Sequence, residues 1–109
     1  MVKKTNIEEV IGKVAREGVT RKVFSGERCM MVINTIEPFA RPALHQHPHE
    51  QITYILAGRC NFTIGEEEVP MGPEDVILIP PEVPHTLTPL GKERIINLDV
   101  FCPIREDYL

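Results

Sequence analysis

The chain has 109 residues, of which 42% are hydrophobic and 26% are charged, and these values predict one globular domain with a modest core. Its formal net charge of −4, without a basic stripe, argues against nucleic acid as a partner. No apolar run approaches the length of a membrane span, and the N-terminus lacks the apolar core of a secretory signal. We therefore expect a cytoplasmic protein that binds neither nucleic acid nor membranes.

The N-terminal stretch TNIEEVIGKV predicts a short helix. Thr5 is followed three residues later by Glu8, which is a capping-box pattern, and Gly12 weakens the helix soon after it starts. From about Val19 the pattern changes to short β-prone runs separated by glycine, proline and charged turns, among them the acidic turn GEEE. The runs are residues 19–24, 29–36, 51–57, 60–64, 76–79, 85–88 and 94–101.

Short strands at this spacing predict an all-β fold, either a sandwich or a small closed barrel. The prolines fall almost wholly between the β-prone runs, where a missing N–H does not interrupt a sheet. An immunoglobulin-like sandwich is the alternative, but the Cys and Trp pattern of immunoglobulin domains is missing. The three cysteines, Cys29, Cys60 and Cys102, are odd in number and widely spaced, which predicts reduced and mostly buried thiols.

Three of the four histidines lie in HQHPHEQ, residues 45–51. In an extended strand His45 and His47 share one face, about 6.5–7 Å apart, and both can reach one metal ion. His49 has the same parity, but one ion rarely takes so many ligands from one straight strand, and Pro48 disturbs the pairing. The spacing alone leaves open which of the three is not a ligand, and a solvated His-rich turn is the alternative.

The fourth histidine, His85, follows a β-prone run and a proline-rich turn in EDVILIPPEVPH. The turn holds the backbone before the chain enters the next strand, so the side chain has a defined position at a strand edge. A single histidine at such an edge is more often structural than a ligand. Together with the two alternating histidines and the nearby amide of Gln51, it favours a metal site.

These segments resemble the two sequence motifs of the cupins. HQHPHEQITYILAG resembles the first motif, in which two alternating histidines precede a Glu or Gln and then a Gly. Gln51 stands seven residues before Gly58, where cupins have their third ligand, so the resemblance selects His45 and His47 and leaves His49 outside. PEDVILIPPEVPH resembles the second motif, and by this resemblance the fourth ligand is His85.

The second motif departs from the cupin pattern at three positions that are not ligands. Glu74 and Glu82 stand where cupins often have glycine, and Pro89 replaces an Asn that can follow the last histidine. The resemblance implies a single-domain jelly-roll barrel, or double-stranded β-helix, over residues 19–109. A segment with a short helical part precedes it at residues 1–18.

The resemblance also implies one divalent metal ion. Three neutral imidazoles and a neutral amide leave its charge uncompensated, so it attracts an anionic substrate. Imidazole suits zinc, nickel, copper and iron alike, and the ligands do not identify the metal. We expect zinc, nickel, iron or manganese.

The C-terminal stretch LDVFCPIREDYL resembles the ending of the KdgF-type cupins of pectin and alginate breakdown, as do GVTRKVFSGE and MMVINTIEPFA nearer the N-terminus. The resemblance implies an enzyme that opens the ring of a 4,5-unsaturated monouronate (unsaturated galacturonate or mannuronate) to a linear 4-deoxy-5-keto-uronate. Carried over by motif, Asp99 is the general acid/base, and Phe101 and Arg105 contact the sugar acid. A carboxylate suits the two proton transfers, and a guanidinium fork suits a uronate carboxylate.

Alternatives remain for these residues and for the function. Asp99 also fits a solvent-facing position in an edge strand, and Arg105 fits an exposed ion pair with Glu106 or Asp107. A metal-dependent dioxygenase, another cupin isomerase and a non-catalytic or orphan cupin that binds or senses sugars are the alternative functions. An oxygenase requires a redox-active ion and O₂, whereas a binding protein keeps its fold and metal but turns over nothing.

Strand parity makes the assignment of Asp99 testable. In IINLDVF, ordinary patterning turns the apolar residues Ile96, Leu98 and Val100 inward and leaves Asp99 in water. The enzyme requires the reverse, with Asp99 and Phe101 facing a cavity, because a strand cannot turn both sets inward. We expect the cavity-facing arrangement.

A homodimer is expected from the strand that follows the first motif. Ile52, Tyr54 and Leu56 are apolar on the face opposite Gln51 and Thr53. If this face does not meet the second sheet, a partner subunit is the simplest cover for it. Cupins commonly pair in this way.

Overall fold

The structure is a computed structural model that describes residues 2–109, and these form nine strands and two short 3₁₀ turns. The elements are η1 Ile7–Glu9, β1 Lys13–Arg16, β2 Val19–Ser25, β3 Met30–Ile36, β4 Glu50–Ala57, β5 Arg59–Ile64, β6 Glu67–Met71, β7 Val76–Ile79, β8 His85–Leu90, β9 Ile95–Cys102 and η2 Glu106–Tyr108. Among the described residues, no helix has the length and apolar character needed to cross a membrane.

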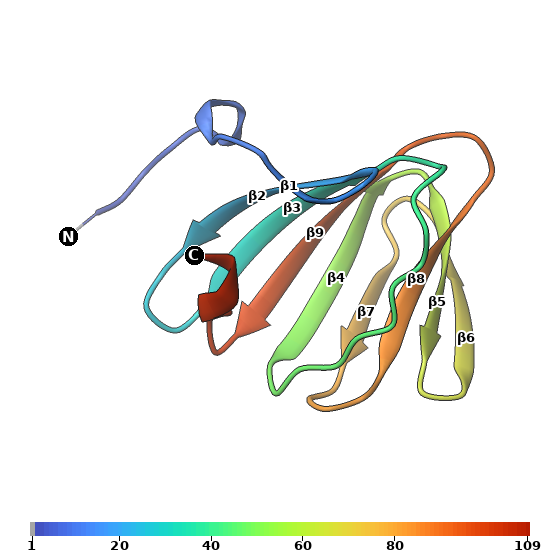
Figure 1. The fold of residues 1–109 in the computed structure, drawn as a ribbon. Coiled ribbons are helices and arrows are strands. Elements are labelled where there is room, and N and C mark those ends of the chain that lie inside the picture. Colours follow the sequence, from blue (N-terminus) through green and yellow to red (C-terminus); the bar gives the residue numbers. More distant parts are fainter. Residues whose placement is uncertain (1) are drawn as a thin grey trace.

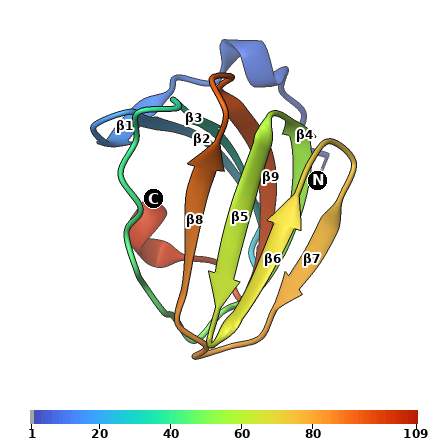
Figure 2. The ribbon, with the colours of Figure 1, turned by 90° about the vertical axis from the view of Figure 1, so that its right-hand side faces the viewer.

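The strands form two antiparallel sheets that face each other (Figures 1 and 2). The larger sheet has the order β1-β2-β3-β9-β4-β7, and the smaller one has the order β6-β5-β8. Figure 2 shows the smaller sheet in front of the larger one. This architecture is the jelly-roll barrel of a single all-β domain, as the resemblance implied.

Two apolar clusters lie on the inner face of the larger sheet, and a polar zone separates them. One cluster is made by Val19, Ile36, Ala40, Ile55, Cys60, Phe62, Met71, Ile79 and Ile95. The other is made by Met30, Val32 and Phe101. The cross-strand register places polar side chains of β2, β3, β4 and β9 between the two clusters.

The N-terminal helical segment is only a 3₁₀ turn, and its cap differs from the predicted one. Asn6, not Thr5, is the N-cap, because its side chain accepts a hydrogen bond from the backbone N–H of Glu8 at 2.9 Å. Asn is the better N-cap of the two residue types. After this turn the chain becomes extended and pairs with β2 as β1, a strand that the sequence patterns did not predict.

The acidic stretch GEEE is only partly a turn, which corrects the expectation. Glu67 and Glu68 belong to β6, an edge strand of the smaller sheet. Charged residues are common on edge strands, because they discourage pairing with other chains. Pro70 and Pro89 also lie within strands, but in β6 and β8, the two edges of that sheet, where proline is tolerated.

Candidate metal centre

Two segments far apart in sequence meet at the histidines. The backbones of His45 and His85 exchange two hydrogen bonds, with N···O distances of 3.0 and 2.9 Å. The N–H of Glu82 donates to the carbonyl of His47 at 2.8 Å. The segment before β4 is not the continuous strand that the spacing suggested. It pairs only at His45, and β4 begins at Glu50, after Pro48 has removed a backbone donor.

This arrangement brings the predicted ligands together. The candidate ligand atoms of His45, His47 and His85 all lie within 4.8 Å of one another. The amide oxygen of Gln51 lies 3.0 Å from Nε2 of His47. His49 is not part of the three-histidine cluster, and its backbone carbonyl instead lies 3.1 Å from Nδ1 of His47.

The hydrogen bonds of the imidazole rings suit a metal ion. Nδ1 of His45, His47 and His85 faces a backbone carbonyl at 2.8, 3.1 and 2.9 Å, respectively. A proton on each Nδ1 leaves the lone pair of Nε2 free for a metal. Nε2 of His85 is buried without a hydrogen-bond partner among the described residues. Burial lowers the pKa of all three histidines, which favours the neutral form that binds metal.

Gln51 is oriented by its neighbours. Its amide nitrogen donates to Oγ1 of Thr53 at 2.9 Å and to Oδ1 of Asp99 at 3.1 Å. The amide oxygen therefore points the other way, towards His47. The carboxylate of Asp99 thus determines which end of this amide faces the histidine cluster.

Asp99 accepts four hydrogen bonds from protein side chains. Thr53, Asn97 and Gln51 donate to Oδ1 at 2.6, 2.9 and 3.1 Å, whereas only Asn34 donates to Oδ2, at 2.8 Å. Burial raises the pKa of Asp99, and these hydrogen bonds act in the opposite direction. Oδ2, with a single donor, is the oxygen with capacity left for a ligand.

Strand β9 has the cavity-facing arrangement. Asn97, Asp99 and Phe101 are 2%, 7% and 1% exposed, respectively. Ile96, Leu98 and Val100 are only partly buried, on the opposite face of the sheet. The solvent-facing alternative for Asp99 is therefore wrong, although its catalytic role stays a prediction.

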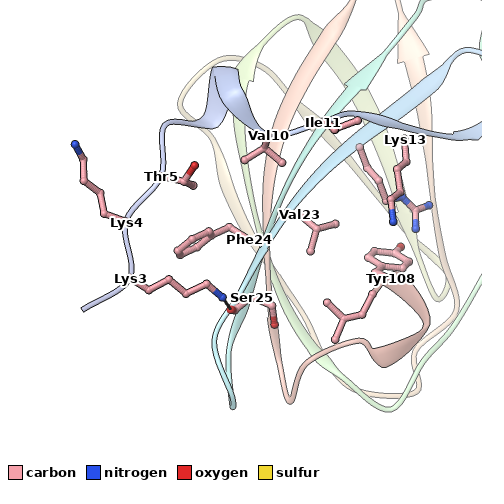
Figure 3. A pocket seen from close by; sticks show the side chains of 12 residues that line it. Lys3, Lys4, Thr5, Val10, Ile11, Lys13, Val23, Phe24, Ser25 and Tyr108 are labelled. Atoms are coloured by element: carbon pink, nitrogen blue, oxygen red, sulfur yellow. Dashed lines mark hydrogen bonds between the residues drawn. The ribbon is translucent and has the colours of Figure 1, made fainter. Parts of the chain in front are cut away.

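A cavity of about 80 Å³ adjoins the histidines and Asp99. It is lined by Arg16, Val19, Arg21, Asn34, Ile36, Ala43, His45, Gln51, Phe62, His85, Leu87, Asn97, Asp99 and Tyr108. A larger groove of about 500 Å³ lies between the N-terminal segment and β2 and shares Arg21 and Tyr108 with this cavity. The groove (Figure 3) is lined by lysines and apolar side chains and has no histidine, so it offers no metal ligands.

The two residues predicted to contact substrate have different surroundings. Phe101 packs against the site without lining the cavity, with its ring centre 5.5 Å from that of His47 and 5.8 Å from that of Tyr108. Arg105 forms an ion pair with Asp107 at 2.9 Å and donates to the hydroxyl of Tyr108 at 2.8 Å. The ion pair that the sequence left as an alternative is therefore present. Contact of Arg105 with a sugar acid stays a prediction.

Four further residues of the site were not identified as such from the sequence: Arg21, Asn34, Thr53 and Tyr108. Thr53 is two residues after Gln51 on β4 and so lies on the same face of the strand. This spacing was a signal that could have placed Thr53 in the site. Arg21 and Asn34 lie opposite each other because of the register between β2 and β3, and local sequence patterns do not encode that register. With Asn97, Asp99, Thr53 and Gln51 they form a row of polar side chains across the larger sheet, here called the polar band.

Comparison with known proteins agrees with this geometry. The sequence model of the cupin domain matches residues 32–101, which include both histidine motifs and Asp99. The chain belongs to the cupin family. An uncharacterised protein from Methanocaldococcus jannaschii, MJ1618, is 28% identical to this cupin over 92 residues, which are 84% of this chain and 71% of that one.

Solved structures share the fold of this cupin. KdgF from a Halomonas species has a TM-score of 0.90 and 24% identity, and the match covers 100% of both chains. An RmlC-like cupin from Shewanella frigidimarina has a TM-score of 0.88 and 23% identity, covering 96% of this chain and 94% of that one. A predicted oxalate decarboxylase from Thermotoga maritima has a TM-score of 0.81 and 17% identity, covering 94% and 100%. Identities this low show a common fold only.

Two departures from the cupin pattern have a visible structural setting. Glu74 and Glu82 have φ angles of 74° and 66°, in the left-handed region that glycine adopts most easily. Glu82 uses its N–H to hold the carbonyl of His47. This cupin thus keeps both left-handed turns of the second motif without glycine.

Proposed function

We propose that this cupin opens the ring of 4,5-unsaturated monouronates to give linear 4-deoxy-5-keto-uronates. The proposal rests on one observation, the position of Asp99 on the inner face beside three clustered histidines. Among the cavity-lining residues Asp99 is the only carboxylic acid. The structural likeness to KdgF and the matching C-terminal motif support the same reaction.

The reaction is an isomerisation in which one group can carry the proton. The anomeric hydroxyl loses a proton, the bond from C1 to the ring oxygen breaks, and C1 becomes an aldehyde. The electron pair of that bond goes to the former ring oxygen, which becomes an enolate on C5. A proton is then added at C4, and C5 becomes a ketone. We assign both proton transfers to Oδ2 of Asp99, because this oxygen has a single protein donor, Asn34.

His45, His47, His85 and Gln51 would hold a divalent ion beside this carboxylate. When bound, the ion supplies Lewis acidity that polarises oxygen atoms of the substrate. Thr53 and Asn97 hold Oδ1 of Asp99 and leave Oδ2 towards the substrate. Phe101 packs against His47 and would exclude water from that side of the metal site.

The cavity of about 80 Å³ is smaller than the roughly 300–1,000 Å³ of typical small-molecule sites. Substrate entry therefore requires the lining to move, and we expect the movement at η2. Tyr108 in this turn lines both the small cavity and the adjacent groove of about 500 Å³. Displacement of its ring would join the two spaces.

The test is turnover of unsaturated galacturonate by metal-reconstituted protein. We expect the far-ultraviolet absorbance of the double bond to fall and a linear keto-uronate to form, by NMR, with or without O₂. The metal-free protein is the control. A metal-loaded, folded protein that leaves the substrate unchanged would contradict the proposal and favour a binding function. Dependence on O₂ would favour an oxygenase.

A further inference from the structure

Two buried polar atoms of the polar band lack partners. Nε of Arg21 and Oδ1 of Asn97 are buried without a hydrogen bond to any of the residues 2–109. Asn97 is 2% exposed, and its Nδ2 donates to Asp99. Its amide oxygen is therefore directed away from that carboxylate. An unpaired buried donor or acceptor is unfavourable, and most such groups in native proteins have a protein, water or ligand partner.

Both residues line the cavity beside the histidines. The register pairs Arg21 with Asn34 and Asn34 with Asn97, so the three lie in one row on the inner face. Arg21 and Asn97 are two strand spacings apart, about 9.5 Å between backbones. The long side chain of Arg21 shortens this gap. One end of the row thus has a free cationic donor, and the other has a free acceptor.

We propose that Arg21 and Asn97 form a subsite for a hydroxy acid. Arg21 binds the carboxylate, and the amide oxygen of Asn97 accepts a hydrogen bond from a hydroxyl group. A neutral sugar lacks the anion, and a simple carboxylic acid lacks the hydroxyl, so a sugar acid fits both ends of the row. The inference deepens the proposed function, on which the choice of a uronate rests.

Arg105 is less available for this task. Its Nη2 lies 2.9 Å from a carboxylate oxygen of Asp107, and its Nη1 donates to Tyr108. The guanidinium of Arg21 also lies against Tyr108, with its central carbon 3.7 Å from the ring centre. That contact covers one face of Arg21 and leaves Nε without a hydrogen bond. Arg105 therefore positions Tyr108, and Arg21 meets the anion.

The experiment uses zinc-loaded protein and compounds that lack the 4,5-double bond. Galacturonate and galactose are titrated by NMR or calorimetry. We expect galacturonate to bind about tenfold more tightly or better, since a hydrogen bond to a charged group is worth at least that factor. Arg21→Met should remove this preference while leaving galactose binding unchanged. Arg21→Gln, which is also uncharged, replaces Arg21→Met if that variant does not fold.

A control variant makes the test specific. Lys22→Met removes a cation from the neighbouring position on β2, and it should keep the preference. For Asn97, cyclohexanecarboxylate replaces galactose as the probe, because it has the anion without hydroxyl groups. Asn97→Ala should weaken galacturonate binding and leave cyclohexanecarboxylate binding unchanged.

The preference surviving in a folded, uncharged Arg21 variant, or lost in Lys22→Met, would overturn the assignment to Arg21. Loss of binding to both probes in Asn97→Ala would indicate a structural role for that residue and overturn its half of the proposal. The ring-opening reaction is tested separately. Galacturonate binding that depends on Arg21, without turnover of the unsaturated uronate, would refute the reaction and keep the subsite.

A second, independent observation concerns the cysteines. The sulfur atoms of Cys29 and Cys102 lie 2.9 Å apart, although the residues are 73 positions apart in sequence. Cys29 is exposed and Cys102 is partly exposed, which corrects the expectation of mostly buried thiols. Cys60 is buried, and burial raises the pKa of its thiol to about 11. The sulfurs are within about 1 Å of the disulfide bond length.

We infer that Cys29 and Cys102 are a site of reversible oxidation by peroxides. One thiol loses its proton, and the thiolate attacks hydrogen peroxide to become a sulfenic acid; the hydroxide that leaves takes up that proton and becomes water. The second thiol then attacks the sulfenic sulfur, and a second water leaves as the disulfide forms. Two thiols are thereby oxidised and one peroxide is reduced to two waters. The bond would tie the loop between β2 and β3 to the end of β9, next to Phe101.

Peroxide treatment of the folded, full-length protein tests this site. We expect loss of two hydrogen atoms by intact mass, a peptide that links Cys29 to Cys102, and recovery of both thiols with a reductant. Cys60 should stay reduced, and it is the internal control. A Cys29→Ser protein should not form the intramolecular bond. Retention of all three thiols, or bonds only between chains, would overturn the inference.

Discussion

Around the polar band, the two faces of the larger sheet differ from the usual pattern of apolar residues inside and polar residues outside. The inner face contains the polar band, which includes Asp99 at 7% and Gln51 at 4% exposure. On the outer face, Ile52 is 43% and Leu78 is 54% exposed. Apolar burial usually decides which side of a strand faces inward. Here the side chains around Asp99 bond to one another, Nε of Arg21 and Oδ1 of Asn97 have no partner among the described residues, and the group adjoins a histidine cluster. This combination indicates that this part of the sheet is arranged for ligand binding.

The largest effect is expected from the inner-face histidines. Replacing His47 or His85 by alanine should reduce zinc or nickel affinity by more than the roughly 10–100-fold typical of losing an outer-shell partner. His49→Ala is the matched control, since His49 lies outside the cluster. Calorimetry and metal analysis of the purified proteins measure this. Equal losses in His49→Ala and His47→Ala would show that the wrong histidine was excluded.

The next largest effect is expected from Asp99→Asn. Turnover of the unsaturated uronate should fall by about 100-fold or more, because an amide does not accept the proton. The fold and the bound metal should be retained. The hydrogen bonds can be kept, because a flip of the Asn34 amide presents its oxygen to the NH₂ group of the new asparagine side chain. The amide oxygen of that asparagine can still accept from Thr53. Kinetics, circular dichroism and metal content together measure this, and normal turnover would remove Asp99 from the mechanism.

The outer face provides the third prediction. We propose that it pairs with a second copy of the chain, because Ile52 lies opposite Leu78, and Tyr54 opposite Val76, in a continuous apolar surface. Leu78→Lys should shift sedimentation from dimer to monomer at micromolar concentration. Glu68→Lys, on the edge of the smaller sheet, should not. A wild-type protein that sediments only as a monomer would contradict the proposed dimer.

The smallest effect is expected on the free energy of unfolding, when two neighbouring residues on opposite faces of β4 are replaced. Thr53→Val removes a hydroxyl that donates to Asp99 and accepts from Gln51, so the free energy of unfolding should fall by about 1–3 kcal/mol. Tyr54→Phe, on the outer face, should change it by less than about 0.5 kcal/mol. Urea denaturation of the metal-free proteins measures both. A loss below about 0.5 kcal/mol in Thr53→Val would mean that the Thr53 hydroxyl adds little to stability.

Much of the fold follows from local pattern. The seven runs chosen from β-prone residues all became strands, because alternation and turn residues act over a few positions. The strands β1 and β6 were missed, since an exposed run and an acidic edge strand have no apolar periodicity. The cap at Asn6 instead of Thr5 is a shift of one residue, at the limit of what local pattern resolves.

For the site, the sequence by itself determined which residues share a strand face. It put Asp99 and Phe101 on the same face of one strand, and it put Gln51 seven residues before Gly58. It also contained the two histidine-bearing motifs. Strand parity does not decide which of two faces turns inward, because that depends on what the neighbouring strands supply. Only the tertiary structure decided this. It brought Asn34, Thr53 and Gln51 to Asp99 as donors.

Tertiary structure also decided the contacts between segments far apart in the chain. Arg21 meets Tyr108, and Cys29 meets Cys102, through strand register and the path of loops. Arg105 pairs with Asp107 within the tail, as one local alternative allowed, yet its contact with Tyr108 over the cavity became visible only in three dimensions. Local sequence limits the conformations of each segment, whereas the pairing of distant segments depends on the packing of the whole barrel.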